Sequence, residues 1–197
     1  MVQITVPSPV ITAAVLPRSK VVSIALVIGF ALLTAGAAQL VIPLPYTPVP
    51  ITGQTFVVLL AGVALGSNLG AASMALYVAL GAIGLPFYAE GSSGIEVVRG
   101  ATGGYLVGFV VAAWVMGRLA ERRQDRAMAT AIPLFLLGSV TIHLFGVPWL
   151  AHTLGVSGTE AIELGSVPFI VGDLVKVVVA GTVLPATWRL VRTLRNP

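Results

Sequence analysis

The sequence predicts an all-α integral membrane protein that forms a single domain over residues 1–197. Of these residues, 57% are hydrophobic and 9% are charged, and the mean hydropathy is +1.00. This composition is too apolar for a soluble domain of such length. Apolar segments of membrane-spanning length recur along the chain. Because lipid offers the backbone no hydrogen-bond partners, such segments form helices that satisfy their own N–H and C=O groups.

Six segments are candidate transmembrane helices when each is judged against a requirement of roughly 20 apolar residues. The second and third are short, so we expect them to be tilted or to extend into the flanking segments. A tight turn at residues 66–70, with a glycine at each end, separates these two. The six candidates cover about residues 21–40, 54–65, 69–83, 103–116, 127–150 and 168–188.

The first segment carries small residues at a four-residue spacing, Ala31 and Ala35. Small residues at this spacing let a second helix approach closely. Internal packing is one explanation. Contact with a partner subunit is the sharper one, because the chain has no G-x-x-x-x-G-K-[ST] loop with which to hydrolyse ATP itself. The segment exceeds the ~7–15 apolar residues of a signal peptide, so we interpret it as a span.

Two loops between the spans have an unusual composition. Residues 43–53 contain four prolines, which lack a backbone donor and disfavour helix, so an apolar loop is expected there. Residues 84–94 are rich in glycine and carry Glu90, and the same segment continues to Tyr105. Such loops either close over a ligand held between helices or form interfacial caps with an aromatic belt. Gln54 and Tyr77, on the second and third spans, contribute either to helix packing or to a ligand-binding site.

The distribution of Lys and Arg orients the chain, because short cytoplasmic loops collect these residues. With six spans, nine of the eleven cations fall on one side, and Arg99 is the only cation in the opposite loops, which carry four glutamates. We therefore expect a multi-pass protein of the plasma membrane, surrounded by membrane lipid, with both termini in the cytoplasm. The nine cations are Arg18, Lys20, Arg118, Arg122, Arg123, Arg126, Arg189, Arg192 and Arg195.

The sixth segment contains two charged side chains, Asp173 and Lys176. A charge near the middle of a bilayer costs about 2.5–3.5 kcal/mol on insertion scales, so it normally faces a partner or a water-filled cavity. Residues i and i+3 share one helix face. The pair therefore either neutralises itself or presents an acceptor and a donor to a ligand. Its position shortly after Pro168 places it in the outer half of the membrane, within reach of both loops.

Several classes of function are excluded or disfavoured. The absence of cysteine rules out disulfides and thiolate metal sites, and the two histidines do not form a metal motif. His143 is expected to pack inside the fifth span. The chain has neither a G-x-S-x-G nor an H-E-x-x-H motif, which disfavours an enzyme. The pI near 10.0 reflects cations at the ends of spans and not a nucleic-acid partner. No metal or cofactor is expected.

Four blocks of sequence, PYTPVPITGQTF, GLPFYAEGSSG, TGGYLVGF and PFIVGDLVK, resemble in order and spacing the BioY family. Members of that family are the biotin-binding S components of energy-coupling factor (ECF) transporters. The resemblance covers about residues 20–190. It implies a six-helix membrane subunit that binds biotin from the outside at high affinity. It also implies two kinds of partner, a transmembrane coupling protein and two ABC-type ATPases.

The resemblance suggests a ligand for the charged pair. Biotin has a ureido ring with two N–H donors and one carbonyl, an apolar ring and chain, and a carboxylate. Asp173 would accept the ureido N–H groups, and Lys176 would donate to the carbonyl. Tyrosines would cover the rings, while Arg99 or backbone amides of the glycine loops would hold the carboxylate. Two alternatives stay open: an ion-coupled secondary carrier that uses Asp173 and Lys176 as an intramembrane ion site, and a structural subunit without a ligand.

Overall fold

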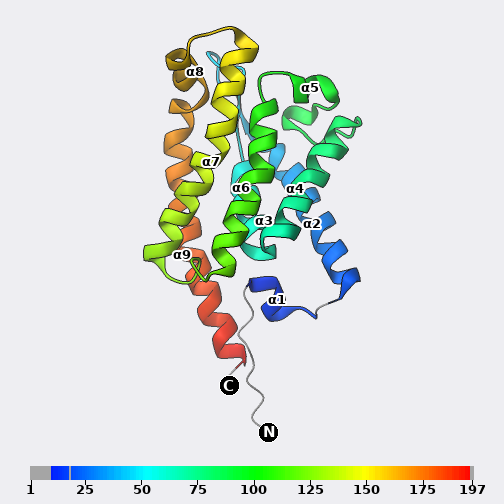
Figure 1. The fold of residues 1–197 in the computed structure, drawn as a ribbon, viewed down its shortest axis with the longest axis vertical. Coiled ribbons are helices and arrows are strands. Elements are labelled where there is room, and N and C mark those ends of the chain that lie inside the picture. The colour runs from blue at the N-terminus through cyan, green and yellow to red at the C-terminus, as the bar shows by residue number, and fades with distance from the viewer. Residues whose placement is uncertain (1–9, 18, 196–197) are drawn as a thin grey trace.

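The protein is an elongated bundle of helices (Figure 1). The structure, a computed structural model, describes residues 10–17 and 19–195. Arg18, one of the cations used to orient the chain, lies outside the described residues, as does the side chain of Arg195. Helix α1 (Ile11–Val15) and the end of α9 lie at one end of the bundle, and α5 (Ile95–Arg99) and α8 (Gly158–Gly165) lie at the other. The described residues include just two strands, of two residues each, so the all-α prediction is confirmed.

Six helices form the body of the bundle, close to the six predicted segments. The main differences are at their ends. The fourth helix runs to Glu121 and not Met116, and the sixth runs to Arg195 and not Trp188, because charged residues with good helix propensity continue the helix beyond the apolar run. The six are α2 (Lys20–Ala38), α3 (Gln54–Leu65), α4 (Ser67–Ala82), α6 (Gly103–Glu121), α7 (Met128–Leu154) and α9 (Ile170–Arg195).

Four helical stretches of the described chain are long and apolar enough to cross a bilayer. Three of them are α2, α6 and α7. The fourth, Gly158–Thr193, includes α8, the short 3-10 helix η2 (Val167–Phe169) and most of α9. Helices α3 and α4 are apolar but shorter. The protein is therefore a multi-pass membrane protein with several apolar helices.

The turn between α3 and α4 is a single residue, Gly66, where a tight turn at residues 66–70 was expected. Its φ of +86° lies in the region that favours glycine. Helix α4 starts immediately afterwards because Glu121, from α6, accepts hydrogen bonds from both the backbone N and the hydroxyl of Ser67, each at 2.8 Å. The first N–H groups of a helix have no partner within the helix. Glu121 thus supplies a hydrogen-bond partner for one of these N–H groups and holds the turn at Gly66 against α6.

Helix α6 is central to the bundle and packs against α3, α4 and α7. Glycine allows some of these contacts: a Cβ added at Gly104 would lie 2.3 Å from the Cβ of Trp149, on α7. Close helix approach of this kind is typical of membrane proteins, where packing replaces the hydrophobic effect as the source of association. The large side chains of Tyr77 and Phe135 are fully buried in the same core.

The small-residue face of α2 packs inside the chain, as the internal-packing explanation expects, and its contact with a partner subunit stays a prediction. Ala31 is 0% exposed and Ala35 is 8% exposed. Helix α4 packs on α2, and the Ser73 hydroxyl of α4 donates to the Val27 carbonyl at 2.9 Å. Four-residue spacing correctly indicates a close helix approach. The approaching helix belongs to the chain itself.

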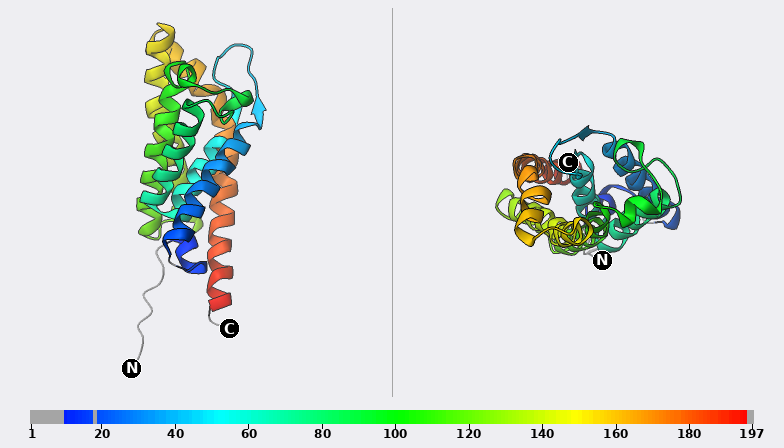
Figure 2. Two further views of the ribbon diagram at one scale, coloured as in Figure 1. Left: turned by 90° about the vertical axis from the view of Figure 1, so that its right-hand side faces the viewer. Right: turned by 90° about the horizontal axis from the view of Figure 1, so that it is seen from above.

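The proline-rich loop is closed at its base by a short antiparallel pairing that the proline content does not predict. Strand β1 (Val41–Ile42) pairs with β2 (Ile51–Thr52), with Val41 opposite Thr52. Residues 43–50 form the expected loop between the strands, and it projects beside the end of α2 (Figure 2). The pairing holds Thr52 directly before the start of α3.

The second loop, residues 84–102, contains the one-turn helix η1 (Ala89–Gly91) and α5. Tyr88 anchors it: the side chain is buried, and its hydroxyl donates to the Val78 carbonyl at 2.7 Å. Gln39, the residue after α2, adds two contacts, because its Nε2 donates to the Tyr88 carbonyl at 3.1 Å and its Oε1 accepts from the Gly91 amide at 2.9 Å. The loop is therefore held to α2 and α4.

At the opposite end, the loop between α6 and α7 contains a buried carboxyl group. Asp125 is fully buried and accepts a hydrogen bond from Nε1 of Trp188, on α9. The guanidinium carbon of Arg126 lies 4.0 Å from the centroid of the Trp188 ring. Burial raises the pKa of the Asp125 carboxyl, against the opposing effects of the Trp188 hydrogen bond and the Arg126 charge. These contacts attach the second half of α9 to the loop.

Candidate ligand-binding site

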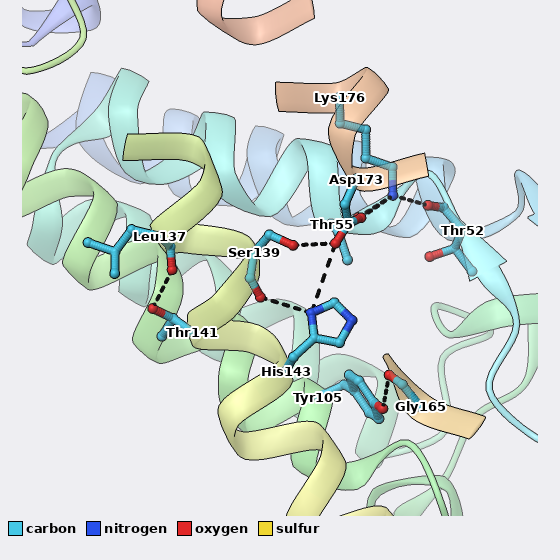
Figure 3. Close-up of polar contacts among 10 residues, drawn as sticks. All are labelled: Thr52, Thr55, Tyr105, Leu137, Ser139, Thr141, His143, Gly165, Asp173 and Lys176. Carbon is cyan, nitrogen blue, oxygen red and sulfur yellow. Dashed lines mark hydrogen bonds and ion pairs between the residues drawn. The ribbon is translucent and has the colours of Figure 1, made fainter. Parts of the chain in front are cut away.

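Asp173 and Lys176 lie on one face of α9 near its start and form an ion pair, with 3.3 Å between Asp173 Oδ1 and Lys176 Nζ. Lys176 Nζ also donates to the Thr55 hydroxyl of α3 at 2.6 Å and to the Thr52 carbonyl at 3.2 Å (Figure 3). An ammonium group has three N–H donors. These three acceptors therefore use all of them.

Helix α7 holds Asp173 from the other side. The Ser139 hydroxyl donates to Asp173 Oδ2, and Nδ1 of His143 lies 3.9 Å from the same oxygen. The side chains of Asp173, Lys176 and His143 are 12%, 19% and 16% exposed. Buried charges are tolerated when they are paired and hydrogen-bonded, and groups from α3, α7, α9 and β2 meet that condition here. The polar cluster consists of Thr52, Thr55, Ser139, His143, Asp173 and Lys176.

Every member of the polar cluster except Ser139 lines a cavity of about 270 Å³. The rest of the wall is mostly apolar and comes from α6, α7 and η2, and both loops contribute residues. A few convergent polar groups in an apolar cavity are typical of a site for a small organic molecule. The apolar lining includes Pro48, Val49, Pro50, Val97, Leu106, Phe109, Ile142 and Phe169.

Three other predicted site residues line the same cavity: Gln54, Glu90 and Tyr105. Gln54 Nε2 donates to the Tyr77 hydroxyl at 2.8 Å. The Tyr105 hydroxyl donates to the Gly165 carbonyl at 2.6 Å, so this group is already engaged by the fold. Glu90 is exposed and has a φ of +59°, a conformation that is uncommon outside glycine.

Two predicted site residues lie outside the cavity lining. Tyr77 is fully buried and packs edge-on against Tyr88, with ring centroids 5.8 Å apart. Arg99 forms an ion pair with Glu96 at 3.7 Å, and their side chains are 72% and 84% exposed. The structure brings neither Tyr77 nor Arg99 to the polar cluster.

Comparison with known proteins identifies the family. The sequence model of the BioY family matches residues 11–193. This chain belongs to the BioY family. Biotin transporter BioY of Thermotoga maritima is 40% identical to it over 143 residues, which cover 72% of this chain and 82% of that protein. Probable biotin transporter BioY of Lysinibacillus sphaericus is 32% identical over 186 residues, which cover 91% and 93%.

A solved structure has the same fold as this BioY chain. It is the crystal structure of the S-component for biotin from an ECF-type ABC transporter, which matches with a TM-score of 0.75 over 92% of this chain and 96% of that one. The identity between the two is 23%. At that identity the match establishes how the BioY chain folds.

Several residues of the polar cluster in this BioY chain could not be selected from sequence. Ser139 and His143 are four residues apart and so share a face of a largely apolar helix, but this spacing is equally compatible with packing. Thr52 and Thr55 flank the start of α3, where polar residues are common. What distinguishes all four is contact with Asp173 or Lys176 across 30 or more positions of sequence.

Proposed function

We propose that this chain is the biotin-binding S component of an ECF-type transporter and captures biotin from outside the cell. It is a transporter subunit and not an enzyme. Family membership and the relatives named as biotin transporters support the proposal. Because the sequence has no nucleotide-binding loop of the G-x-x-x-x-G-K-[ST] type, uptake needs an external source of energy. The ECF module, a transmembrane coupling protein with two ABC-type ATPases, would supply it.

One observation supports the ligand: the cavity presents an acceptor, Asp173 Oδ1, and a donor, Lys176 Nζ, side by side within apolar walls. A ureido group places N–H donors next to a carbonyl acceptor and complements this pair. Asp173 would accept from the ureido N–H groups, and Lys176 would donate to the carbonyl in a charge-assisted hydrogen bond. Apolar side chains such as Phe109 would contact the sulfur ring and the chain.

Binding requires an exchange of contacts, because the three donors of Lys176 are already used. The ligand carbonyl would replace one acceptor, and the Thr52 carbonyl, at 3.2 Å, makes a longer contact than the Thr55 hydroxyl, at 2.6 Å. Thr52 ends the pairing that closes the proline-rich loop. The exchange would thus connect ligand binding to the position of that loop.

For the ligand carboxylate, the cavity lining favours backbone amides over Arg99. Residues 100–102, which lead into α6, line the cavity, and amides at the start of a helix favour anions. Arg99 lies outside that lining and is paired with Glu96. Arg99→Ala is therefore expected to retain the wild-type preference for biotin over biotin amide.

We also propose six membrane crossings with both termini in the cytoplasm. Helix α1, the arginine-rich loop at residues 122–127 and the end of α9 lie at one end of the bundle (Figure 1). Cations at one end mark the cytoplasmic side. The cavity and its two loops lie toward the other end, which would face outside. In this arrangement α3 and α4 are two of the six crossings.

The decisive experiment is equilibrium binding of labelled biotin to the purified chain. Asp173→Asn and Lys176→Met should each lower the affinity at least about tenfold, because each removes a charge-assisted hydrogen bond worth about 1.5–3 kcal/mol. Lys20→Met is the matched control, since Lys20 is the other lysine of the chain and is exposed. Glu160→Gln, an exposed carboxylate on α8, controls for Asp173→Asn. Wild-type affinity in Asp173→Asn would show that the ligand assignment is wrong.

A further inference from the structure

His143 is held so that a single ring nitrogen is left to take up a proton. Nδ1 lies 3.0 Å from the Ser139 carbonyl oxygen. That oxygen can only accept, so Nδ1 carries a hydrogen in both the neutral and the protonated ring. The ring packs edge-on against Tyr105, with centroids 6.0 Å apart, and against Phe169 at 5.8 Å. Proton uptake therefore occurs at Nε2 and adds a full charge to a ring whose orientation is already set.

This added charge would lie beside the carboxylate proposed to bind the ligand. His143 Nδ1 is 3.9 Å from Asp173 Oδ2 (Figure 3). Both residues line the ligand cavity, and both also line a neighbouring apolar groove of about 480 Å³ formed chiefly by α7 and α9. They thus stand in the wall between the cavity and the groove. Charges are screened less in such apolar surroundings than at a solvated surface.

Few other charged or titratable groups face His143. Helix α9 contributes Asp173 and Lys176, α6 contributes Tyr105, and Glu90 of the second loop lines the same cavity. On α8, Glu160 and Glu163 are exposed and line neither the cavity nor the groove. Between about pH 5.5 and 7.5, histidine is the side chain that ordinarily changes charge, while tyrosine, lysine and ordinary carboxyl groups do not.

We propose that His143 is a proton-sensitive positioning residue: when neutral it leaves Asp173 available to the ligand, and when protonated it engages Asp173 itself. The inference rests on the proposed function, because it concerns the same carboxylate. An imidazolium 3.9 Å from Asp173 Oδ2 draws negative charge of the carboxylate toward itself and so weakens Oδ1 as an acceptor for the ureido N–H groups. Biotin therefore binds more weakly as the pH falls through the titration of His143.

The test is equilibrium binding of labelled biotin to the purified full-length chain between about pH 5.5 and 7.5. We expect the wild-type affinity to fall several-fold toward the acid end, with tenfold as the limit for a one-unit difference in proton affinity between the free and bound states. His143→Asn should bind at pH 7.5 and lose the pH dependence. Asparagine is chosen because its amide N–H can replace Nδ1 as donor to the Ser139 carbonyl but does not take up a proton. His143→Gln is the second variant.

The chain contains two histidines, which provides a matched control and a direct readout. His152 is exposed near the end of α7, so His152→Asn should keep the wild-type pH profile. In the His152→Asn protein, the ring-proton NMR signals of His143 can be followed without altering His143 itself. Biotin should shift the midpoint of their titration to lower pH. This measurement decides the question even if the His143 variants do not fold.

Biotin amide separates the inference from an effect on the ligand carboxylate. Both ligands carry the ureido ring, so both should show the same pH dependence. The inference is overturned if the wild-type profile is flat, if the dependence persists in both folded His143 variants, or if it occurs with biotin and not with the amide. It is also overturned if biotin does not shift the His143 titration. A wild-type chain that binds no biotin at pH 7.5 would refute the proposed function instead.

Discussion

Removing Lys176 alone should destabilise the ligand-free protein more than neutralising Lys176 and Asp173 together. The two charged atoms are 3.3 Å apart, and Coulomb's law with an effective dielectric constant of 20 gives an attraction of about 5 kcal/mol at this separation. Most of that attraction offsets the lost hydration of the two ions. Lys176→Met removes the attraction and leaves the cost for Asp173, whose side chain is 12% exposed.

The expected loss of unfolding free energy in Lys176→Met is about 3–5 kcal/mol, the usual cost of removing one partner of a buried pair. In Asp173→Asn/Lys176→Met neither charge remains, and the amide oxygen of the introduced asparagine could still accept from Ser139. The loss of unfolding free energy in the double variant should therefore be at least about 2 kcal/mol smaller than the sum of the losses in the two single variants.

The assay is reversible unfolding in mixed detergent micelles, with the four proteins arranged as a double-mutant cycle. Lys20→Met combined with Asp173→Asn is the control cycle, and its two effects should add. If the losses from Lys176→Met and Asp173→Asn also add within about 0.5 kcal/mol, the two side chains do not interact in the folded protein. The interpretation of the polar cluster would then be wrong.

Two further changes test the packing outside the cavity. In the folded chain the raised pKa of Asp125 means that more protons are bound than in the unfolded chain, so stability declines as the pH rises through the folded value. Asp125→Asn, which keeps an acceptor for Trp188, should abolish that decline above the ordinary pKa of an aspartate carboxyl, and an unchanged pH slope of the unfolding temperature would contradict it. Gly104→Ala places a Cβ 2.3 Å from the Cβ of Trp149 and should cost about 1–3 kcal/mol. Gly29→Ala, with no atom within 4 Å, is the control, and equal unfolding temperatures for the two would refute the packing argument.

Hydrophobic pattern predicts where the long helices lie, but their ends depend on other forces. Helix α3 matches its prediction because Gly53 and Gly66 bound it closely. Helices α6 and α9 continue five and seven residues, respectively, past the ends predicted for them, because charged residues favour helix once a helix has started. Neither the pairing of β1 with β2 nor the one-residue turn at Gly66 can be predicted from the sequence of one segment alone. Both depend on contacts between distant parts of the chain.

Residues of the candidate site could be predicted from the sequence only where their position in the membrane carries a free-energy cost. Asp173 and Lys176 could be found because a charge within a span is expensive and needs a partner. Neutral groups such as the Ser139 hydroxyl carry no comparable penalty, since their own helix can accept the hydrogen bond. For Ala31 and Ala35 the sequence leaves the approaching helix unidentified, for a related reason. Their spacing indicates that a helix comes close, but it contains no information about which chain supplies that helix.

The shortness of α3 and α4 connects the cavity to the membrane around it. Their 12 and 16 residues rise about 18 and 24 Å, against a hydrocarbon core of about 30 Å, while the 27 residues of α7 rise about 40 Å. Helices α3 and α4 are therefore shorter than the hydrocarbon core, and α7 is longer. The proline-rich loop enters α3 and the second loop leaves α4, so both loops start at the short helices. With α3 and α4 as membrane crossings, lipids with longer chains would increase the hydrophobic mismatch at these two helices. Bilayer thickness would then affect the position of the two loops that line the cavity.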